Sequence, residues 1–203
     1  MDTKILSVYT CLGATYAASF CDTHKTYKCL DIDVRDFALE KRKPTKEELE
    51  KYKARVIKRF NERPTMLGPD YFVDKAAKEE RYYENKNYPN NLVSYIKDQI
   101  GKVDFIFVPS HLKIRIALQD AKIDYITVYP APNMLEGLAG RMLLAHYPIR
   151  SIELQKLEFN KNLSGIVFEP HGSKIIYLQY GEYLLNILDD IKDGDFEEDL
   201  DLY

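Results

Sequence analysis

Short apolar segments alternate along this chain with segments of helical periodicity. Five of them have the length and apolar character of β-strands: Ile5–Thr10, Thr26–Leu30, Val103–Val108, Tyr125–Tyr129 and Lys174–Leu178. Helices are predicted at Gly13–Phe20, from Thr45 to just before Pro64, from Asn90 or Asn91 to Ile100, at His111–Ala121, from Asn133 to about His146 and at Tyr183–Ile191. Strands that alternate with helices pair in parallel through right-handed crossovers. The sequence therefore predicts an α/β protein with a three-layer, doubly wound parallel sheet of about five strands.

Capping residues indicate where several of these helices begin. Thr45 with Glu48, and Asn133 with Glu136, match the capping box, in which a side-chain oxygen and a carboxylate satisfy the first free amides of a helix. Ser110 follows the most apolar strand and is the predicted N-cap of the next helix.

Length, charge and composition narrow the classes of protein that fit. The 203 residues are expected to form one domain, with a helical and loop excursion at about residues 38–88 and an acidic tail at residues 193–203. The net charge of −3, from 29 Lys and Arg against 32 Asp and Glu, gives no overall basic field, which disfavours a nucleic-acid partner but leaves room for local basic patches. Three cysteines, no signal peptide and no apolar run near the roughly 18 residues of a membrane span predict a cytoplasmic protein without a membrane partner.

The turn after the first strand has the outline of a phosphate-binding loop. In such a loop, a Gly precedes a Lys and a Ser or Thr, because backbone amides hold the phosphates, the ammonium reaches the β and γ oxygens and the hydroxyl holds Mg²⁺. Gly13 and Thr15 match this pattern, but Ala14 takes the place of the lysine and Val8 that of the first glycine. Backbone amides and the helix dipole survive the loss of a lysine, so a phosphate cradle is predicted. It would consist of Cys11, Leu12, Gly13, Ala14 and Thr15. The alternative is an inherited turn that binds nothing.

Polar residues follow the other predicted strands and would share the same edge of the sheet, where ligands of such sheets bind. Asp31 is the candidate that would accept the proton of a substrate hydroxyl or hold Mg²⁺ through water. The candidate substrate-binding residues are Asp33, Arg35, Ser110, His111 and Arg115. The alternative for the two aspartates is a pair of turn carboxylates beside the basic residues 41–43. A zinc site of three cysteines and a histidine, at positions 11, 21, 24 and 29, is disfavoured by its spacing.

Taken together, these motifs resemble a family of phage-type P-loop kinases that are similar in layout to adenylate kinases and act on nucleosides or nucleotides. The matching residues are Gly13-Ala14-Thr15, Asp31-Ile32-Asp33, Pro89-Asn90-Asn91, Pro109-Ser110-His111 with Arg115, Val128-Tyr129-Pro130, Arg141 and Tyr180-Gly181-Glu182-Tyr183-Leu184. The resemblance implies ATP and Mg²⁺ as cofactors if the protein is active, with Thr15 at the metal, Asp31 and Arg141 as catalytic residues, and the host cytoplasm as its location if the chain is virally encoded.

The departures from the family lead to two main hypotheses. Ala14 replaces a lysine, and the segment after Pro132 carries one arginine, Arg141, where lids of this kind carry two or more. Loss of one preorganised charge commonly costs on the order of 10²-fold in rate. The protein is therefore either a nucleotide-binding kinase-like protein with impaired phosphoryl transfer to a nucleoside, nucleotide or modified base, or a pseudokinase that sequesters a nucleotide or binds a protein partner. Nucleic-acid contact through residues 41–58 and 82–86 is a third, weaker interpretation, because glutamates are interspersed there.

Overall fold

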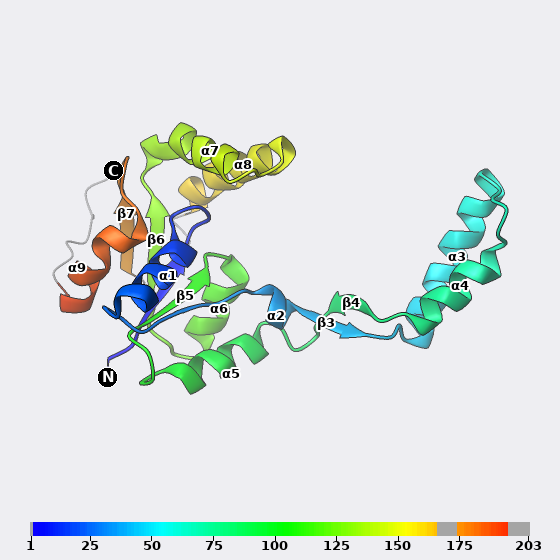
Figure 1. Ribbon diagram of the computed structural model, residues 1–203, viewed down its shortest axis with the longest axis horizontal. Coiled ribbons are helices and arrows are strands. Elements are labelled where there is room, and N and C mark those ends of the chain that lie inside the picture. Colours follow the sequence, from blue (N-terminus) through cyan, green and yellow to red (C-terminus); the bar gives the residue numbers. More distant parts are fainter. Residues whose placement is uncertain (1, 166–173, 195–203) are drawn as a thin grey trace. The chain divides into compact units, whose positions relative to one another are not determined.

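The computed structural model describes residues 2–165 and 174–194, and it divides the chain into two compact units (Figure 1). The core unit comprises residues 1–34 and 89–203, and the inserted unit comprises residues 35–88. The single domain expected from the length of the chain stays a prediction. The predicted acidic tail falls at residues 193–203, of which only residues 193 and 194 are among those described.

The core unit is built on a five-stranded parallel sheet with the strand order β2-β5-β1-β6-β7. The strands are β1 (Lys4–Val8), β2 (Cys29–Asp31), β5 (Phe105–Pro109), β6 (Ile126–Pro130) and β7 (Lys174–Leu178). From β1 the chain adds strands first on one side and then on the other. The strand order thus reverses around β1, and in doubly wound sheets ligands bind outside the carboxyl ends of the strands at such a point.

Helices cover both faces of this sheet, as Figure 1 shows. On one face Leu6 and Phe107 of the strands pack in a single cluster with Ala17 and Cys21 of α1 and Leu188 of α9. The elements of that face are α1 (Ala14–His24), η3 (Leu184–Ile187) and α9 (Leu188–Asp193).

The alternation of a strand sends its other residues to the opposite face. There Ile5 and Ile106 are buried, as are Leu92 of α5 and Ile114 of α6. The helices of this face are α5 (Asn90–Gln99) and α6 (Leu112–Asp120). Helices on the two faces confirm the predicted three-layer, doubly wound α/β fold.

After β6 the chain forms a helical pair. The elements are η1 (Pro132–Met134), α7 (Leu135–Leu144) and α8 (Ile149–Gly165), and α7 packs against α8. Ala139 and Met142 of α7 form a small buried cluster with Ile152 of α8, and Cys11 packs against it. The periodicity of the sequence did not reveal α8, and the helix predicted to reach His146 ends at Leu144.

The inserted unit combines a two-stranded sheet with a helical hairpin (Figure 1). Its elements are α2 (Arg35–Ala38), β3 (Leu39–Arg42), α3 (Lys46–Glu62), α4 (Pro69–Lys78) and β4 (Arg81–Glu84). β3 and β4 pair antiparallel, and α3 packs against α4. The capping box of Thr45 and Glu48 is present, as predicted. The strand pair is a correction to the helical and loop excursion expected at about residues 38–88. Its two strands are four residues each and nearly 40 residues apart in sequence, so neither gives a recognisable strand pattern.

Three predicted helix starts are wrong for identifiable reasons. Ser110 is not an N-cap, because its amide still bonds to the Val8 carbonyl of the sheet at 2.9 Å and α6 begins later, behind His111. Asn133 makes no capping box, because Pro132 starts a 3₁₀ turn that contains it. Neither Asn90 nor Asn91 caps α5, whose N-cap is the proline before them.

Candidate phosphate-binding site

The bend between β1 and α1 keeps its first helical amides uncapped. Cys11 and Gly13 both have positive φ angles, of 65° and 89°, and Gly13 is the N-cap of α1. No side chain caps this end of the helix among the residues that the structure describes, and no acidic residue lies in its first turn. The free amides and the positive end of the helix dipole therefore remain available to an anion.

Thr15 in the first turn of α1 meets Asp31 at the end of β2. The Thr15 hydroxyl donates a hydrogen bond of 2.6 Å to Asp31 Oδ2. β2 and β1 are separated in the sheet by β5, but α1 packs against β2 and so carries Thr15 across to it. Two residues that are 16 positions apart, and that the sequence assigns to metal and proton handling, thus share one point at the carboxyl edge.

A hydroxyl and a carboxylate oxygen are ligand types that suit Mg²⁺. Thr15 and Asp31 would hold such an ion, with water and phosphate oxygens completing its shell. Within residues 2–165 and 174–194, no group of three or more His, Cys, Asp or Glu side chains is arranged around a metal site. The chain's own ligands at this bend are therefore few, as they are for Mg²⁺ ions that bridge a protein and a phosphate.

Tyr183, at the N-cap of η3, packs against the bend. A Cβ atom added to Gly13 would lie 3.3 Å from Tyr183 Cδ1, and the Leu184 amide donates to the Leu12 carbonyl at 2.9 Å. The ring and this main-chain bond hold the segment after β7 against one side of the bend. Sequence reasoning did not place Tyr183 at the site; its position next to the last strand was the only signal for it.

Arg141 of α7 brings a positive charge beside the same bend. Its Nη2 donates to the Glu182 carbonyl at 3.1 Å, and its guanidinium carbon lies 4.1 Å from the centre of the Tyr183 ring. Its Nη1 is buried and makes no hydrogen bond within the described part of the chain. Arg141 also lies close enough to Cys11 to affect the pKa of that thiol. The structure thus brings Arg141 to the loop that lacks a lysine.

Cys11 is held as a neutral thiol at the base of the bend. Burial raises its pKa above the usual value, and this outweighs the lowering effects of a hydrogen bond with Tyr147 and of the Arg141 charge. A thiol with a raised pKa is a poor nucleophile at neutral pH. Its contribution to the bend is therefore packing and shape.

Ser110, His111 and Arg115 form a second group after β5. Arg115 Nη1 donates to Ser110 Oγ at 2.8 Å, and the guanidinium lies 5.7 Å from the ring centre of Tyr129 in β6. Only 5% of Arg115 is exposed, whereas the neighbouring His111 is exposed at the edge. Arg115 fixes the loop after β5, and His111 is the residue of this group that a ligand at the edge can reach.

The two remaining candidates belong to different units. Asp33 follows β2 in the core unit, and Arg35 opens α2 in the inserted unit. The core unit brings together a larger set: Cys11, Leu12, Gly13, Ala14, Thr15, Asp31 and Arg141. His24, from the disfavoured zinc set, instead has its ring 4.1 Å from that of Phe20.

The strand order and the helices on both faces define a three-layer, doubly wound α/β protein, with a bend after β1 where the strand order reverses. No known protein family and no curated protein matches the sequence. Among solved structures, the chain is similar to a gluconokinase from Sinorhizobium meliloti 1021, with 13% identity, 95% of this chain and 90% of that chain covered, and a TM-score of 0.44. At this level of similarity, no property of that enzyme is carried over. No helix in the described residues is both long and apolar enough to cross a membrane.

Proposed function

We propose that the bend after β1 binds the phosphates of a nucleotide and that the protein is a P-loop kinase-like phosphotransferase with weakened catalysis. The hydrogen bond between Thr15 and Asp31 carries this proposal, because it joins a metal-type hydroxyl and a carboxylate directly beside the uncapped amides of α1. The acceptor would be a hydroxyl of a nucleoside, a nucleotide or a modified base. Asp31 would take up the proton of that hydroxyl.

Mg²⁺ held by Thr15 and Asp31 would offset the charge of the phosphates when bound. The amides of the bend would orient the phosphates, and Arg141, whose guanidinium lies against Tyr183 beside the bend, would supply positive charge. A guanidinium stacked on Tyr183 is less mobile than a P-loop lysine that reaches into the loop. We therefore expect binding to be retained and transfer to be slow.

Restoring the missing lysine tests this function. The Ala14→Lys variant is compared with the wild type in a Mg²⁺-dependent assay of ATP hydrolysis and transfer, and nucleotide binding is measured by calorimetry. We expect tight nucleotide binding by both proteins and a gain in rate on the order of 10²-fold or more in the variant. Absence of nucleotide binding in both proteins would refute the function.

Arg141→Met gives an independent reading of the same site. We expect it to weaken binding of ATP about tenfold, as for one charge-assisted contact, because roughly 1.4 kcal/mol corresponds to a factor of ten. Arg150→Met is the matched control: Arg150 is an exposed arginine of the neighbouring α8. Equal effects of the two variants would show that Arg141 acts through net charge alone.

A pseudokinase is the second candidate, and the packing of Tyr183 and Arg141 on the bend favours it. A side chain that already occupies one side of the bend stabilises it without ligand. Nucleotide binding without turnover, in the wild type and in Ala14→Lys alike, would identify this function.

A further inference from the structure

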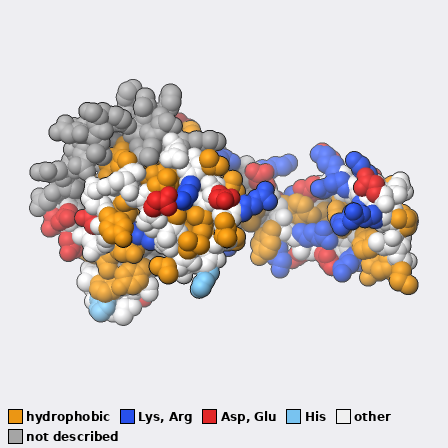
Figure 2. Space-filling model, turned by 90° about the horizontal axis from the view of Figure 1, so that it is seen from above, with side chains coloured by type: hydrophobic (Ala, Val, Ile, Leu, Met, Phe, Trp, Pro, Cys, Tyr) orange, Lys and Arg blue, Asp and Glu red, His pale blue; other side chains and the backbone are white. Residues whose placement is uncertain are grey.

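Positive charge is concentrated in the inserted unit, although the chain as a whole is acidic. Residues 35–88 carry 15 Lys and Arg against 11 Asp and Glu, a net charge of +4, whereas the rest of the chain carries 14 against 21, a net charge of −7. Figure 2 shows many Lys and Arg side chains on the visible face of this unit. The net charge of −3 therefore conceals one basic unit and one acidic unit.

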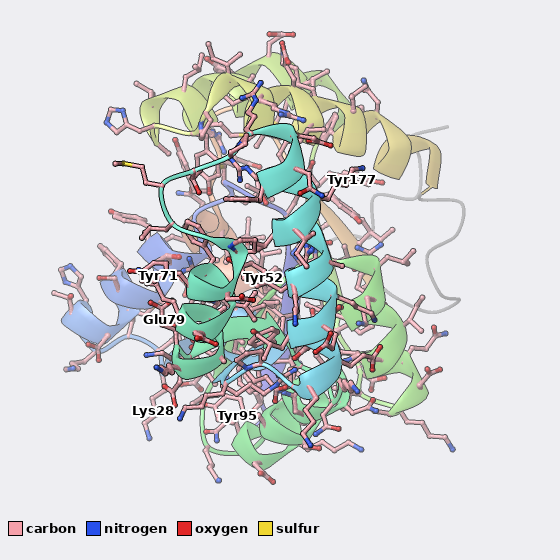
Figure 3. All side chains as sticks on the ribbon, turned by 90° about the vertical axis from the view of Figure 1, so that its right-hand side faces the viewer. Lys28, Tyr52, Tyr71, Glu79, Tyr95 and Tyr177 are labelled. Carbon is pink, nitrogen blue, oxygen red and sulfur yellow. The ribbon has the colours of Figure 1, made fainter. Side chains whose placement is uncertain are left out.

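A pocket of about 320 Å³ lies within the inserted unit, between the helical hairpin and the strand pair. Its lining includes Lys51, Tyr52, Arg55, Arg81, Tyr82 and Tyr83. Figure 3 labels Tyr52 on α3, Tyr71 on the adjacent α4 and Glu79 at the C-cap of α4. The volume is at the lower end of the range for small-molecule sites, and it suits a single aromatic base.

The charge that lines this pocket is positive after its ion pairs are counted. Glu48, the acidic residue of the lining, is bonded to Arg42 at 2.7 Å and belongs to the capping box of α3. Arg55 makes no ion pair among the residues the structure describes; its Nε bonds only to the Lys51 carbonyl, at 3.4 Å. Two lining cations are also ion-paired: Lys51 bonds to Glu47 at 2.6 Å and Arg81 to Glu79 at 3.2 Å. The Arg55 guanidinium is therefore the lining charge that is available to an anion.

Aromatic and basic side chains adjoin one another on both faces of the strand pair. Tyr82 is 70% exposed on β4 and lies opposite Lys41 of β3, so a tyrosine face and an ammonium share the solvent face of the strand pair, away from Arg81 and Tyr83. The Arg81 guanidinium carbon lies 5.3 Å from the ring centre of Tyr52. Aromatic faces interleaved with cations are the combination by which proteins bind single-stranded nucleic acid without sequence preference.

We propose that the inserted unit binds single-stranded nucleic acid, with a base stacked on the exposed Tyr82 beside the pocket and the neighbouring phosphates against Lys41 and Arg55. Single-stranded nucleic acid is favoured over an acidic peptide, because a peptide of this kind would contact the cations but leave the tyrosine faces without a role. The site belongs to residues 35–88 alone, so it holds whether or not the bend after β1 binds a nucleotide.

Fluorescence anisotropy of the full-length protein with a labelled oligo-dT of about 12 nucleotides tests the proposal, since site sizes for such binding run from about 4 to 16 nucleotides. We expect binding that weakens with salt, with a slope of about −0.7 for each phosphate contact. Tyr82→Ala should weaken binding about 5- to 100-fold and leave the salt slope unchanged, because it removes stacking and no charge.

Arg55→Ala should reduce the salt slope by about 0.7. Tyr71→Ala is the matched control, because Tyr71 is a half-exposed tyrosine of α4 in the same unit that does not line the pocket. We expect it to bind as the wild type does. Far-ultraviolet circular dichroism of each variant verifies that the fold is retained.

Three results would overturn the inference. They are absence of binding at low salt, equal losses for Tyr82→Ala and Tyr71→Ala, and displacement of the oligonucleotide by polyglutamate as readily as by unlabelled oligo-dT. The last result would assign the basic unit to an acidic protein partner instead.

Discussion

Replacing Gly13 by alanine adds a single methyl group and tests whether the bend needs the left-handed backbone conformation at this position. Its φ of 89° is strained for any residue with a Cβ, and a Cβ there would lie 3.3 Å from Tyr183 Cδ1. The left-handed conformation costs an alanine about 1–2 kcal/mol. Reduced freedom of the unfolded chain returns about 0.4–1 kcal/mol, and the close contact with the Tyr183 ring adds to the cost. We therefore expect Gly13→Ala to lower the free energy of unfolding by about 1–2 kcal/mol.

For a chain of this size each kcal/mol corresponds to about 2–4 °C, so the melting temperature should fall by about 2–8 °C. Differential scanning calorimetry measures it, with Gly140→Ala as the matched control. Gly140 lies inside α7 with no atom within 4 Å of the added Cβ, so this change should raise the melting temperature by about 1–4 °C.

Gly13→Asn separates backbone strain from crowding, because asparagine tolerates the left-handed region better than alanine does. It should be less destabilising than Gly13→Ala if strain dominates. The reasoning is refuted if Gly13→Ala is as stable as Gly140→Ala, because the bend would then not need the conformation described for it.

Three further predictions concern stability. The hydrogen bond from Arg42 lowers the pKa of Glu48 to about 2, so the stability that this bond contributes to the inserted unit is present above the unfolded pKa near 4.5 and is lost as the pH falls toward 2. Glu48→Gln should remove this acid-sensitive contribution. A circular-dichroism pH titration of both proteins should show the difference. Asp104→Asn should cost about 1.5–3 kcal/mol in urea unfolding, because Asp104 accepts a 2.9 Å bond from Lys192 that ties the sheet to α9; an unchanged midpoint would contradict this. Phe107→Ala, at a fully buried position, should cost about 3–5 kcal/mol, and a loss below 1 kcal/mol would mean that the core repacks freely.

The periodicity of the sequence was sufficient for the sheet because its strands are buried on both faces. Runs such as Phe105–Pro109 and Ile126–Pro130 are almost wholly apolar, and only a parallel sheet covered by helices buries such runs. The capping box of Thr45 and Glu48 was equally local, since four residues contain all its partners.

Features that depend on residues far apart in the chain could not be predicted from the sequence. The pairing of β3 with β4 joins short segments across two helices, and neither strand has an apolar pattern of its own. The Tyr183 ring meets Gly13 across 170 positions, and no local signal links a tyrosine after the last strand to the first bend.

The amino-acid sequence by itself determined the α/β class and the position of the bend between the first strand and the first helix. Hydrophobic periodicity and the residue types of Gly13, Ala14 and Thr15 are local properties. The tertiary structure alone decided which polar and charged side chains contact one another. It brought Thr15 to Asp31 and Arg141 to the side of the bend. Electrostatic interactions fall off with distance in space, and the separation of two residues along the chain does not fix that distance.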